Sequence, residues 1–293
     1  MNKTNTSNVK IVYESEPVGI GSTILRGLHR LYYLTPDEIL YFHFNNILYS
    51  SPNKNVWAAY LKQPFEHQRQ YIEQAFNDKN IIEEHGVFLN KANPLLFGYG
   101  KEQNNASEFL NIDSLVKYRK IVNKYLKFKD ELLIKVDSFC KEYIDNKRVI
   151  CLHKRGTDQF TSRGHAGDVV AFNDDDLKYM VENNLKDYDF IFLATDEDKV
   201  YKLLKKSFGD KVLSYSTMRS LEGDTRGTHF AHVTDTEENK YILGEEAIID
   251  FLIMSRCSYS LCMKSNLSLL TILMRKDFNY KFIDNHIQYD KLG

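Results

Sequence analysis

Short apolar runs that alternate with helical patterns fill the second half of the chain and constrain its fold more than any other feature. The runs at 148–152 (RVICL), 188–194 (YDFIFLA) and 259–262 have the length of strands, and segments with helical spacing follow them. A strand that is apolar on both faces must be covered on both faces, as in the parallel sheets of α/β proteins. The sequence therefore predicts an α/β fold with a doubly wound parallel sheet.

The remaining predicted elements extend this pattern. In the second half, the sequence predicts a short strand at 211–215 and helices at 174–184, 197–207, 245–254 and 267–274. The first half shows a looser alternation, with strands at 10–13 and 38–45, helices at 23–33 and 66–76, and a long helix or helix pair over 114–144. Because 293 residues suffice for about two domains, we expect two Rossmann-like domains, 1–146 and 147–293, that face a cleft. The last helix of the chain could pack back on the N-terminal domain.

Charge and composition exclude several functional classes. Lys and Arg total 39 against 40 Asp and Glu, so the formal net charge is −1 and no basic excess exists to bind nucleic acid. The first residues lack the apolar core of a signal peptide, and the longest apolar stretches are too short to span a bilayer. No CxxC pair is present, and we expect buried thiols in a reducing compartment at Cys140, Cys151, Cys257 and Cys262. These features predict a soluble cytoplasmic protein.

Ligands of open parallel sheets bind beyond the carboxyl ends of the strands, and this rule selects four loops. The first contains Gly19, Gly21 and Ser22 just before a helix, where backbone amides can approach an anion, although ordinary turns use the same residues. The second is the block 153–158 (HKRGTD), directly after a buried strand. Its cations, glycine and hydroxyl suit a diphosphate, with Arg155 making a two-pronged contact; the alternative is a surface turn with an Arg–Asp ion pair.

The other two loops are also polar and also precede helices. Asp196 follows the run 188–194, where it either caps the next helix or contacts a ribose or base, and 264–266 (KSN) follows the run 259–262. Between them lies a segment rich in glycine and charge, which is typical of a mobile site loop and carries Arg219 and His229. No HExxH motif or acidic cluster with metal-ligand spacing is present, so we expect neither a metal nor a cofactor.

Taken in order, these motifs resemble those of the fucosyltransferase superfamily, which includes α1,6-, nodulation, α1,2- and protein O-fucosyltransferases. The block 153–158 is similar to their H-x-R-[RG]-[TG]-D block, and 192–197 (FLATDE) is similar to the strand end that follows it. The run 244–257 resembles their helix ending in Leu-Ser-x-Cys or Asp, with 264–268 (KSNLS) as the Ser-rich turn. The glycine block at 19–22 resembles their amino-terminal one, so four blocks agree in order.

The resemblance implies a GT-B architecture and an inverting, metal-independent hexosyl or fucosyl transfer from a nucleotide sugar, GDP-fucose, to a glycan acceptor. Domain 1–146 is then the acceptor side and 147–293 binds the nucleotide sugar, in polysaccharide or glycan biosynthesis, with peripheral association with a membrane-linked acceptor. Arg155 would hold the β-phosphate and Asp196 the guanine or ribose region. The resemblance also implies that the donor contacts Gly19, Gly21, Ser22, His153, Lys154, Asp158, Arg219, His229, Lys264, Ser265 and Asn266.

The sequence departs from the family pattern in two places. Gly156 stands where α1,6-type enzymes have a second Arg, and Arg163 stands where they have a Glu. The base that takes the acceptor proton is therefore either Asp168, which we favour, or His165, while Arg155 stabilises the departing diphosphate. Two alternatives stay open: a transferase of the same fold that uses another nucleotide sugar or activated group, and a non-catalytic nucleotide- or sugar-binding protein.

Aromatic residues of the first half allow two interpretations. Trp57, Tyr60, Phe65 and the segment 97–100 (FGYG) suit either the core or a platform for an acceptor sugar. The core is the favoured interpretation, because large aromatic side chains at such spacing usually pack inside.

Overall fold

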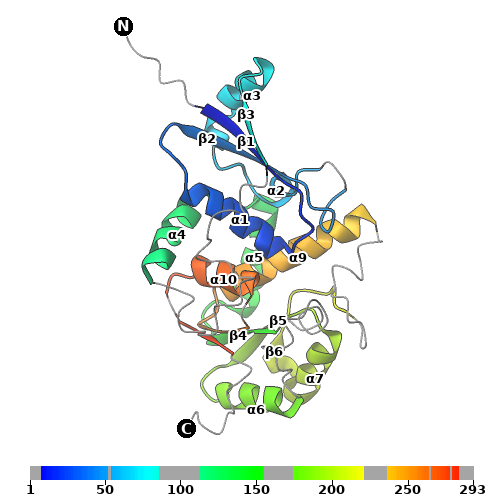
Figure 1. The fold of residues 1–293 in the computed structure, drawn as a ribbon. Helices are drawn as coiled ribbons and strands as arrows, with labels where there is room; N and C mark the ends of the chain where they lie inside the picture. The colour runs from blue at the N-terminus through cyan, green and yellow to red at the C-terminus, as the bar shows by residue number, and fades with distance from the viewer. Residues whose placement is uncertain are drawn as a thin grey trace, which may run out of the picture. The chain divides into compact units, whose positions relative to one another are not determined.

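The chain divides into two compact units, Met1–Leu133 and Ile134–Gly293. The computed structural model (Figure 1) describes residues 8–51, 54–85, 112–154, 174–220, 236–263, 265–277 and 279–283. The division between the units falls inside helix α5 (Asp130–Tyr143), earlier in the chain than the expected boundary at 146/147. The assignment of two functional domains stays a prediction.

The described residues of unit 1 form a three-stranded parallel sheet with the order β2-β1-β3. The central strand β1 pairs with β2 from Asn8↔Glu38 to Glu14↔Phe44, and with β3 from Lys10↔Ile82 to Tyr13↔His85. Its elements are β1 (Asn8–Glu14), α1 (Ile20–Tyr32), β2 (Glu38–Phe44), α2 (Val56–Tyr60), a 3₁₀ turn (Glu66–Gln68), α3 (Arg69–Asn77), β3 (Ile82–His85) and α4 (Ile112–Tyr125). The expected strand–helix–strand start is confirmed, and the expected helix or helix pair over 114–144 is a pair, α4 and α5.

The core of unit 1 uses its large aromatic side chains. Trp57, Tyr60 and Phe65 are all buried, so the core interpretation of these residues is confirmed, whereas 97–100 lies outside the described residues. Trp57 packs edge-on against Phe42 at 4.6 Å between ring centroids. Its indole also fills the space above Gly27 of α1, where a Cβ would lie 2.3 Å from a ring carbon. Gly27 thus lets α1 approach α2 closely.

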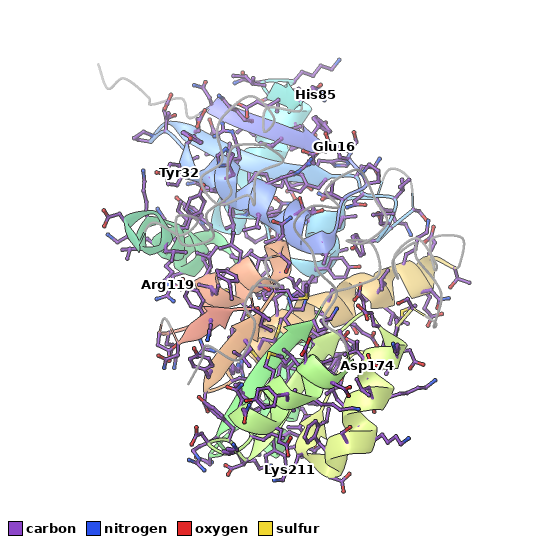
Figure 2. The ribbon with its side chains drawn as sticks, turned by 60° about the horizontal axis from the view of Figure 1, so that its bottom comes forward. Glu16, Tyr32, His85, Arg119, Asp174 and Lys211 are labelled. Carbon is purple, nitrogen blue, oxygen red and sulfur yellow. The ribbon has the colours of Figure 1, made fainter. Side chains whose placement is uncertain are left out.

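Helix α4 packs on α1 through polar aromatic contacts. The ring of Tyr118 stacks on Tyr32, which is labelled in Figure 2, with 4.7 Å between centroids and 20° between planes. The Tyr118 hydroxyl lies 3.1 Å from Nδ1 of His29. Burial raises the pKa of Tyr118, so this phenol stays protonated at neutral pH.

Four charged side chains tie α1 to all three strands of this sheet. Lys10 of β1 lies 2.9 Å from Glu84 of β3, and Arg30 of α1 contacts both Glu38 of β2 and Glu84, at 3.1 and 2.7 Å. Burial alone would raise the pKa of Glu38, but hydrogen bonds from Lys10, from a backbone amide and from Arg30 lower it to about 2. The two carboxylates therefore remain ionised and paired at neutral pH.

Unit 2 contains a five-stranded sheet with the order β6-β5-β4-β7-β8, in which every pairing is parallel. Its elements are β4 (Val149–Lys154), α6 (Asp174–Asn184), β5 (Phe190–Thr195), α7 (Asp198–Phe208), β6 (Val212–Leu213), α9 (Glu237–Met254), β7 (Tyr259–Cys262), α10 (Asn266–Met274) and β8 (Tyr280–Phe282). The expected α/β fold with parallel sheets is confirmed. Helix α9 begins well before the expected residue 245, because Thr236 caps it and two glutamates occupy its first turn.

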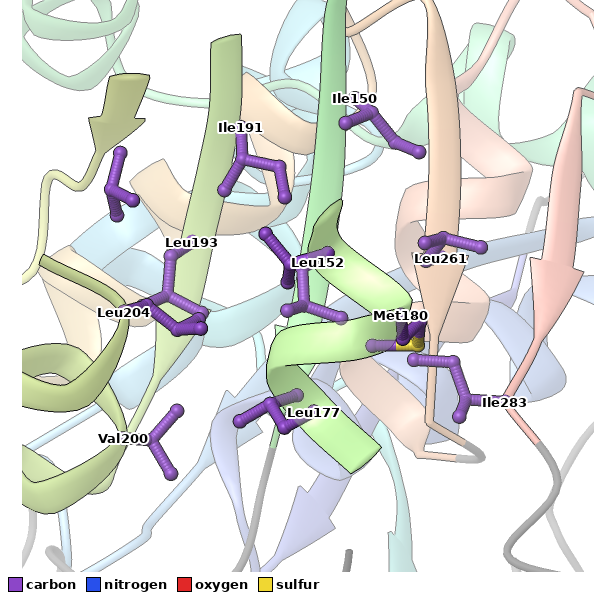
Figure 3. Close-up of a cluster of buried hydrophobic side chains, with 12 residues drawn as sticks. Ile150, Leu152, Leu177, Met180, Ile191, Leu193, Val200, Leu204, Leu261 and Ile283 are labelled. Carbon is purple, nitrogen blue, oxygen red and sulfur yellow. The ribbon is translucent and has the colours of Figure 1, made fainter. Parts of the chain in front are cut away.

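Both faces of β4 are buried. Figure 3 shows the cluster on one face, where Ile150 and Leu152 of β4 pack with side chains of β5, β7, α6 and α7. On the other face, the Sγ atom of Cys151 lies 3.1 Å from the Ser260 hydroxyl. All four cysteines are buried and free, as expected. Among the described residues, no helix has the length and apolar character needed to cross a membrane.

Candidate functional site

The strand order of unit 2 defines where a ligand would bind. From β4 the chain runs outward through β5 to β6 and then returns to the other side of β4 to form β7. Open α/β sheets bind ligands beyond the carboxyl ends of their strands at the point where the order reverses. That point lies between β4 and β7, where His153 pairs in register with Cys262 on one side and with Ala194 on the other. The residues that end these strands form the candidate site.

Two expected site residues, His153 and Ser265, meet at this point. His153 is buried, with Nδ1 2.7 Å from the Ser268 hydroxyl and 3.3 Å from the Ser265 hydroxyl. Ser265 caps α10, because its Oγ accepts a hydrogen bond from the Ser268 amide at 3.1 Å. Asn266 follows as the first residue of the helix and is half-buried. The amino end of α10, where helices attract anions, thus lies beside the end of β4.

Lys154 is the last residue of β4, and its charge is compensated inside the protein. Its Nζ lies 3.1 Å from a carboxylate oxygen of Glu197, and both side chains are largely buried. A buried ammonium needs such a partner, since an unpaired buried charge is strongly destabilising. Sequence reasoning missed Glu197, although its position directly after Asp196 at the end of β5 could have suggested it.

Asp196, which follows β5, is hydrogen-bonded to Ser220, the residue after Arg219. The Asp196 carbonyl accepts hydrogen bonds from the backbone amide and hydroxyl of Ser220, at 2.7 and 2.6 Å. The N-cap residue of α7 is Glu197, so the idea that Asp196 caps this helix is wrong. Arg219 donates to the Ser214 hydroxyl at 2.6 Å, and its guanidinium lies 4.2 Å from the centre of the Tyr201 ring, within cation–π range.

An acidic face of α9 holds the segment that carries Arg219. Glu246 accepts hydrogen bonds from both the amide and the hydroxyl of Thr217, at 3.0 and 2.6 Å, and from the Met218 amide at 3.0 Å. Asp250, one turn later, accepts a hydrogen bond from the Ser216 hydroxyl. Burial raises the pKa of Asp250 to about 7, a shift that Ser216 and Arg219 oppose and Glu246 reinforces. Sequence reasoning missed this role of the carboxylates; the signal was their i, i+4 spacing within an apolar helix.

The glycine block lies at the corresponding place in unit 1. Gly19 is the N-cap residue of α1 and has no side chain that could accept a hydrogen bond from the first amides of the helix. Gly21 is buried and Ser22 half-buried in the first turn. This turn follows the carboxyl end of β1, which is the central strand of its own sheet.

Six expected site residues lie outside the described residues, and their roles stay predictions: Arg155, Asp158, His165, Asp168, His229 and Lys264. Within the described part of the chain, no group of three or more His, Cys, Asp or Glu side chains could hold a metal ion. The expectation of a metal-independent site stays a prediction as well.

The fold is that of known fucosyltransferase structures, which confirms, at the level of the fold, the resemblance found in the sequence. A structure of NodZ α1,6-fucosyltransferase soaked with GDP-fucose aligns with a TM-score of 0.55 at 14% identity, covering 90% of this chain and 92% of that one. NodZ from Bradyrhizobium aligns with a TM-score of 0.54 at 15% identity and the same coverage. POFUT1 in complex with GDP aligns at 0.47 and 11% identity, covering 94% and 98%. The sequence matches no protein-family model and no curated protein.

The buried Asp250 carboxyl should make the stability of the protein depend on pH. Its pKa is about 7 in the folded protein against an ordinary value of 3.8. The folded state therefore binds more protons between these values, and this group's contribution to the free energy of unfolding falls as pH rises from about 4 to about 7. Replacing Asp250 with Asn removes this pH-dependent loss of unfolding free energy. For a pKa shift of this size, the loss is at most about 4 kcal/mol.

Urea unfolding at pH 5 and pH 8 measures this effect. We expect the wild type to lose more stability than Asp250→Asn between the two pH values. Asp137→Asn serves as the control, since it removes an exposed carboxylate paired with Arg256 at 2.6 Å. If the unfolding free energy depends on pH equally in the wild type and in Asp250→Asn, the raised pKa of Asp250 is contradicted.

Proposed function

We propose that this chain is an inverting glycosyltransferase that moves fucose from GDP-fucose to a hydroxyl of a glycan acceptor. The observation that carries the proposal is that His153, Ser265, Asn266 and Asp196 all stand at the carboxyl edge of one parallel sheet, beside the strand that leads into Arg155. The shared fold supports it, because the NodZ structures include one soaked with GDP-fucose and one co-crystallised with GDP. In the proposed GT-B arrangement, 147–293 binds the nucleotide sugar and 1–146 faces the acceptor across a cleft.

Stabilisation of the leaving diphosphate is the main chemical task of the proposed site. Negative charge grows on the GDP oxygens as the bond to the sugar breaks, and prearranged cations and amides lower the energy of that state. Lys154 contributes little net charge, because Glu197 already pairs with it. The task therefore falls on Arg155, directly after β4, and on the amino end of α10. These groups would replace a metal ion.

The acceptor hydroxyl must lose its proton as it attacks the anomeric carbon. The segment 159–171 follows the phosphate block and contains one carboxylate, Asp168, and one imidazole, His165. We propose Asp168 as the base, with His165 as the other candidate. The proposed setting is cytoplasmic glycan or polysaccharide synthesis, with peripheral association with a membrane-linked acceptor.

One alternative function has a specific observation in its favour. Gly156 replaces the second Arg of the α1,6-type block, which removes one positive contact to the donor. A transferase of this fold that uses another nucleotide sugar or activated group would tolerate that loss. A non-catalytic nucleotide- or sugar-binding protein is the remaining candidate.

A panel of nucleotide sugars separates these functions. Thermal shift should rank GDP-fucose above UDP- and CMP-linked sugars, and incubation with a mixture of glycans should release GDP. Release should continue in excess EDTA. A larger shift with another nucleotide sugar would favour the second function, binding without release of nucleotide would favour the third, and loss of release in EDTA with recovery in Mg²⁺ or Mn²⁺ would refute metal independence.

Arg155 provides the sharpest test of the diphosphate site. Arg155→Ala should lower kcat/KM by an amount equivalent to about 2–4 kcal/mol, because charge-assisted contacts to a developing anion have this magnitude. Arg155→Lys should recover little, since Lys cannot make the two-pronged contact. Arg148→Ala, at the opposite end of the same strand and exposed, is the matched control. Near-normal activity and GDP affinity of Arg155→Ala would rule out the assignment.

The base is identified by comparing Asp168→Asn with His165→Asn at saturating donor. The variant that lacks the true base should lose kcat by about 100-fold or more while GDP affinity is unchanged. We expect this loss for Asp168→Asn. If both variants keep most of their kcat, neither residue is the base.

A further inference from the structure

A buried chain of hydrogen bonds links the end of β4 to α10. Ser268 is fully buried, and its Oγ lies 2.6 Å from the Met263 carbonyl, 2.7 Å from Nδ1 of His153 and 3.1 Å from the Ser265 hydroxyl. A backbone hydrogen bond joins the same two segments, because the Met263 amide donates to the His153 carbonyl at 3.2 Å. His153 and the turn before α10 are therefore joined through both backbone and side chain.

The positions of the hydrogens in this chain follow from counting donors. A carbonyl oxygen only accepts, so the single hydroxyl hydrogen of Ser268 is donated to Met263. Ser268 Oγ must then accept from its other two neighbours. The Ser265 hydroxyl donates to it, and so does Nδ1 of His153, which therefore carries a hydrogen. In neutral His153, the lone pair is thus on Nε2.

We infer that Ser268 is a positioning residue of the nucleotide site: it fixes the tautomer and orientation of His153 and sets the spacing between the exit of β4 and the amino end of α10. Neither the Ser268 hydroxyl nor the Ser265 hydroxyl needs to touch a ligand for this role. The tautomer is inferred from the hydrogen bonds of Ser268. The expected effect on nucleotide binding rests on the proposed function.

Removal of the Ser268 hydroxyl should reverse the tautomer. In Ser268→Ala, both Nδ1 of His153 and the Ser265 hydroxyl lose the Ser268 oxygen that accepts their hydrogen bonds. Ser265, already 3.3 Å from Nδ1, can then donate to that nitrogen, which requires the hydrogen of the neutral ring to move to Nε2. Ser268→Thr keeps the hydroxyl and should keep the tautomer.

The test combines NMR with a binding measurement on the full chain. Imidazole ¹⁵N shifts distinguish the two tautomers at about pH 8.5, where an ordinary histidine is neutral, and His153→Gln identifies the signals by their loss. Calorimetry with GDP should show an affinity about 10-fold weaker in Ser268→Ala and normal in Ser268→Thr, since one lost buried hydrogen bond has about this effect. Thr271→Val is the matched control, because this buried hydroxyl of the same helix bonds only to the Leu267 carbonyl among the contacts described.

Each outcome decides a stated part of the inference. A hydrogen on Nε2 in the wild type, or an unchanged tautomer in Ser268→Ala, overturns it. A reversed tautomer with unchanged GDP affinity overturns the positioning role, as does an equal loss of affinity in Thr271→Val. If the wild type binds no GDP, the proposed function fails together with the effect on binding, while the NMR result still decides the tautomer. Thermal unfolding of each variant confirms that it is folded.

Discussion

Strand β4 is paired on both sides and covered on both faces, and the arrangement of unit 2 depends on that burial. Its register with β5 and β7 fixes which residues end side by side at the carboxyl edge. The strand ends in two polar residues, His153 and Lys154, that are buried like the apolar ones before them. A buried polar group is tolerated only with a partner. Each neighbouring strand leads to one: Ser268 beyond β7 and Glu197 beyond β5.

Unit 1 satisfies its internal charges in a different way. Arg30 and Lys10 are placed between Glu38 and Glu84, so that four residues from α1 and three strands form one network. Apolar side chains of α1 and of the strands, such as Leu28 and Phe42, are buried as well. The ionic contacts add to this packing and help to fix the position of α1, because a shift of the helix would separate Arg30 from both carboxylates at once.

Much of this fold was predictable because parallel strands covered on both faces leave a clear trace in the sequence. The bounds expected for β7 and α6 agree with the structure. Strand β3 was not predicted because two of its four residues are glutamates. One of these, Glu84, forms an ion pair with Arg30. Residues that end strands, such as His153, could be foreseen by the carboxyl-edge rule. The position of Glu197 at a strand end could be foreseen in the same way, but its pairing with Lys154 and that of Ser268 with His153 could not, because these pairings depend on strand register and on which face of a helix turns inward.

The pairing of β4 with β7 also has a consequence for how the protein is made. Val149 and Ser258, which are bonded at the start of this pairing, are separated by 109 positions in the chain. Ribosomes add roughly 5–20 residues per second, so β4 waits on the order of 5–20 s for β7 to be synthesised. During that time, one long edge of an apolar strand has no native neighbour. The nascent chain is therefore exposed to misassociation at this stage, and chaperone binding during synthesis would act on the 148–262 segment before α10 can complete the candidate site.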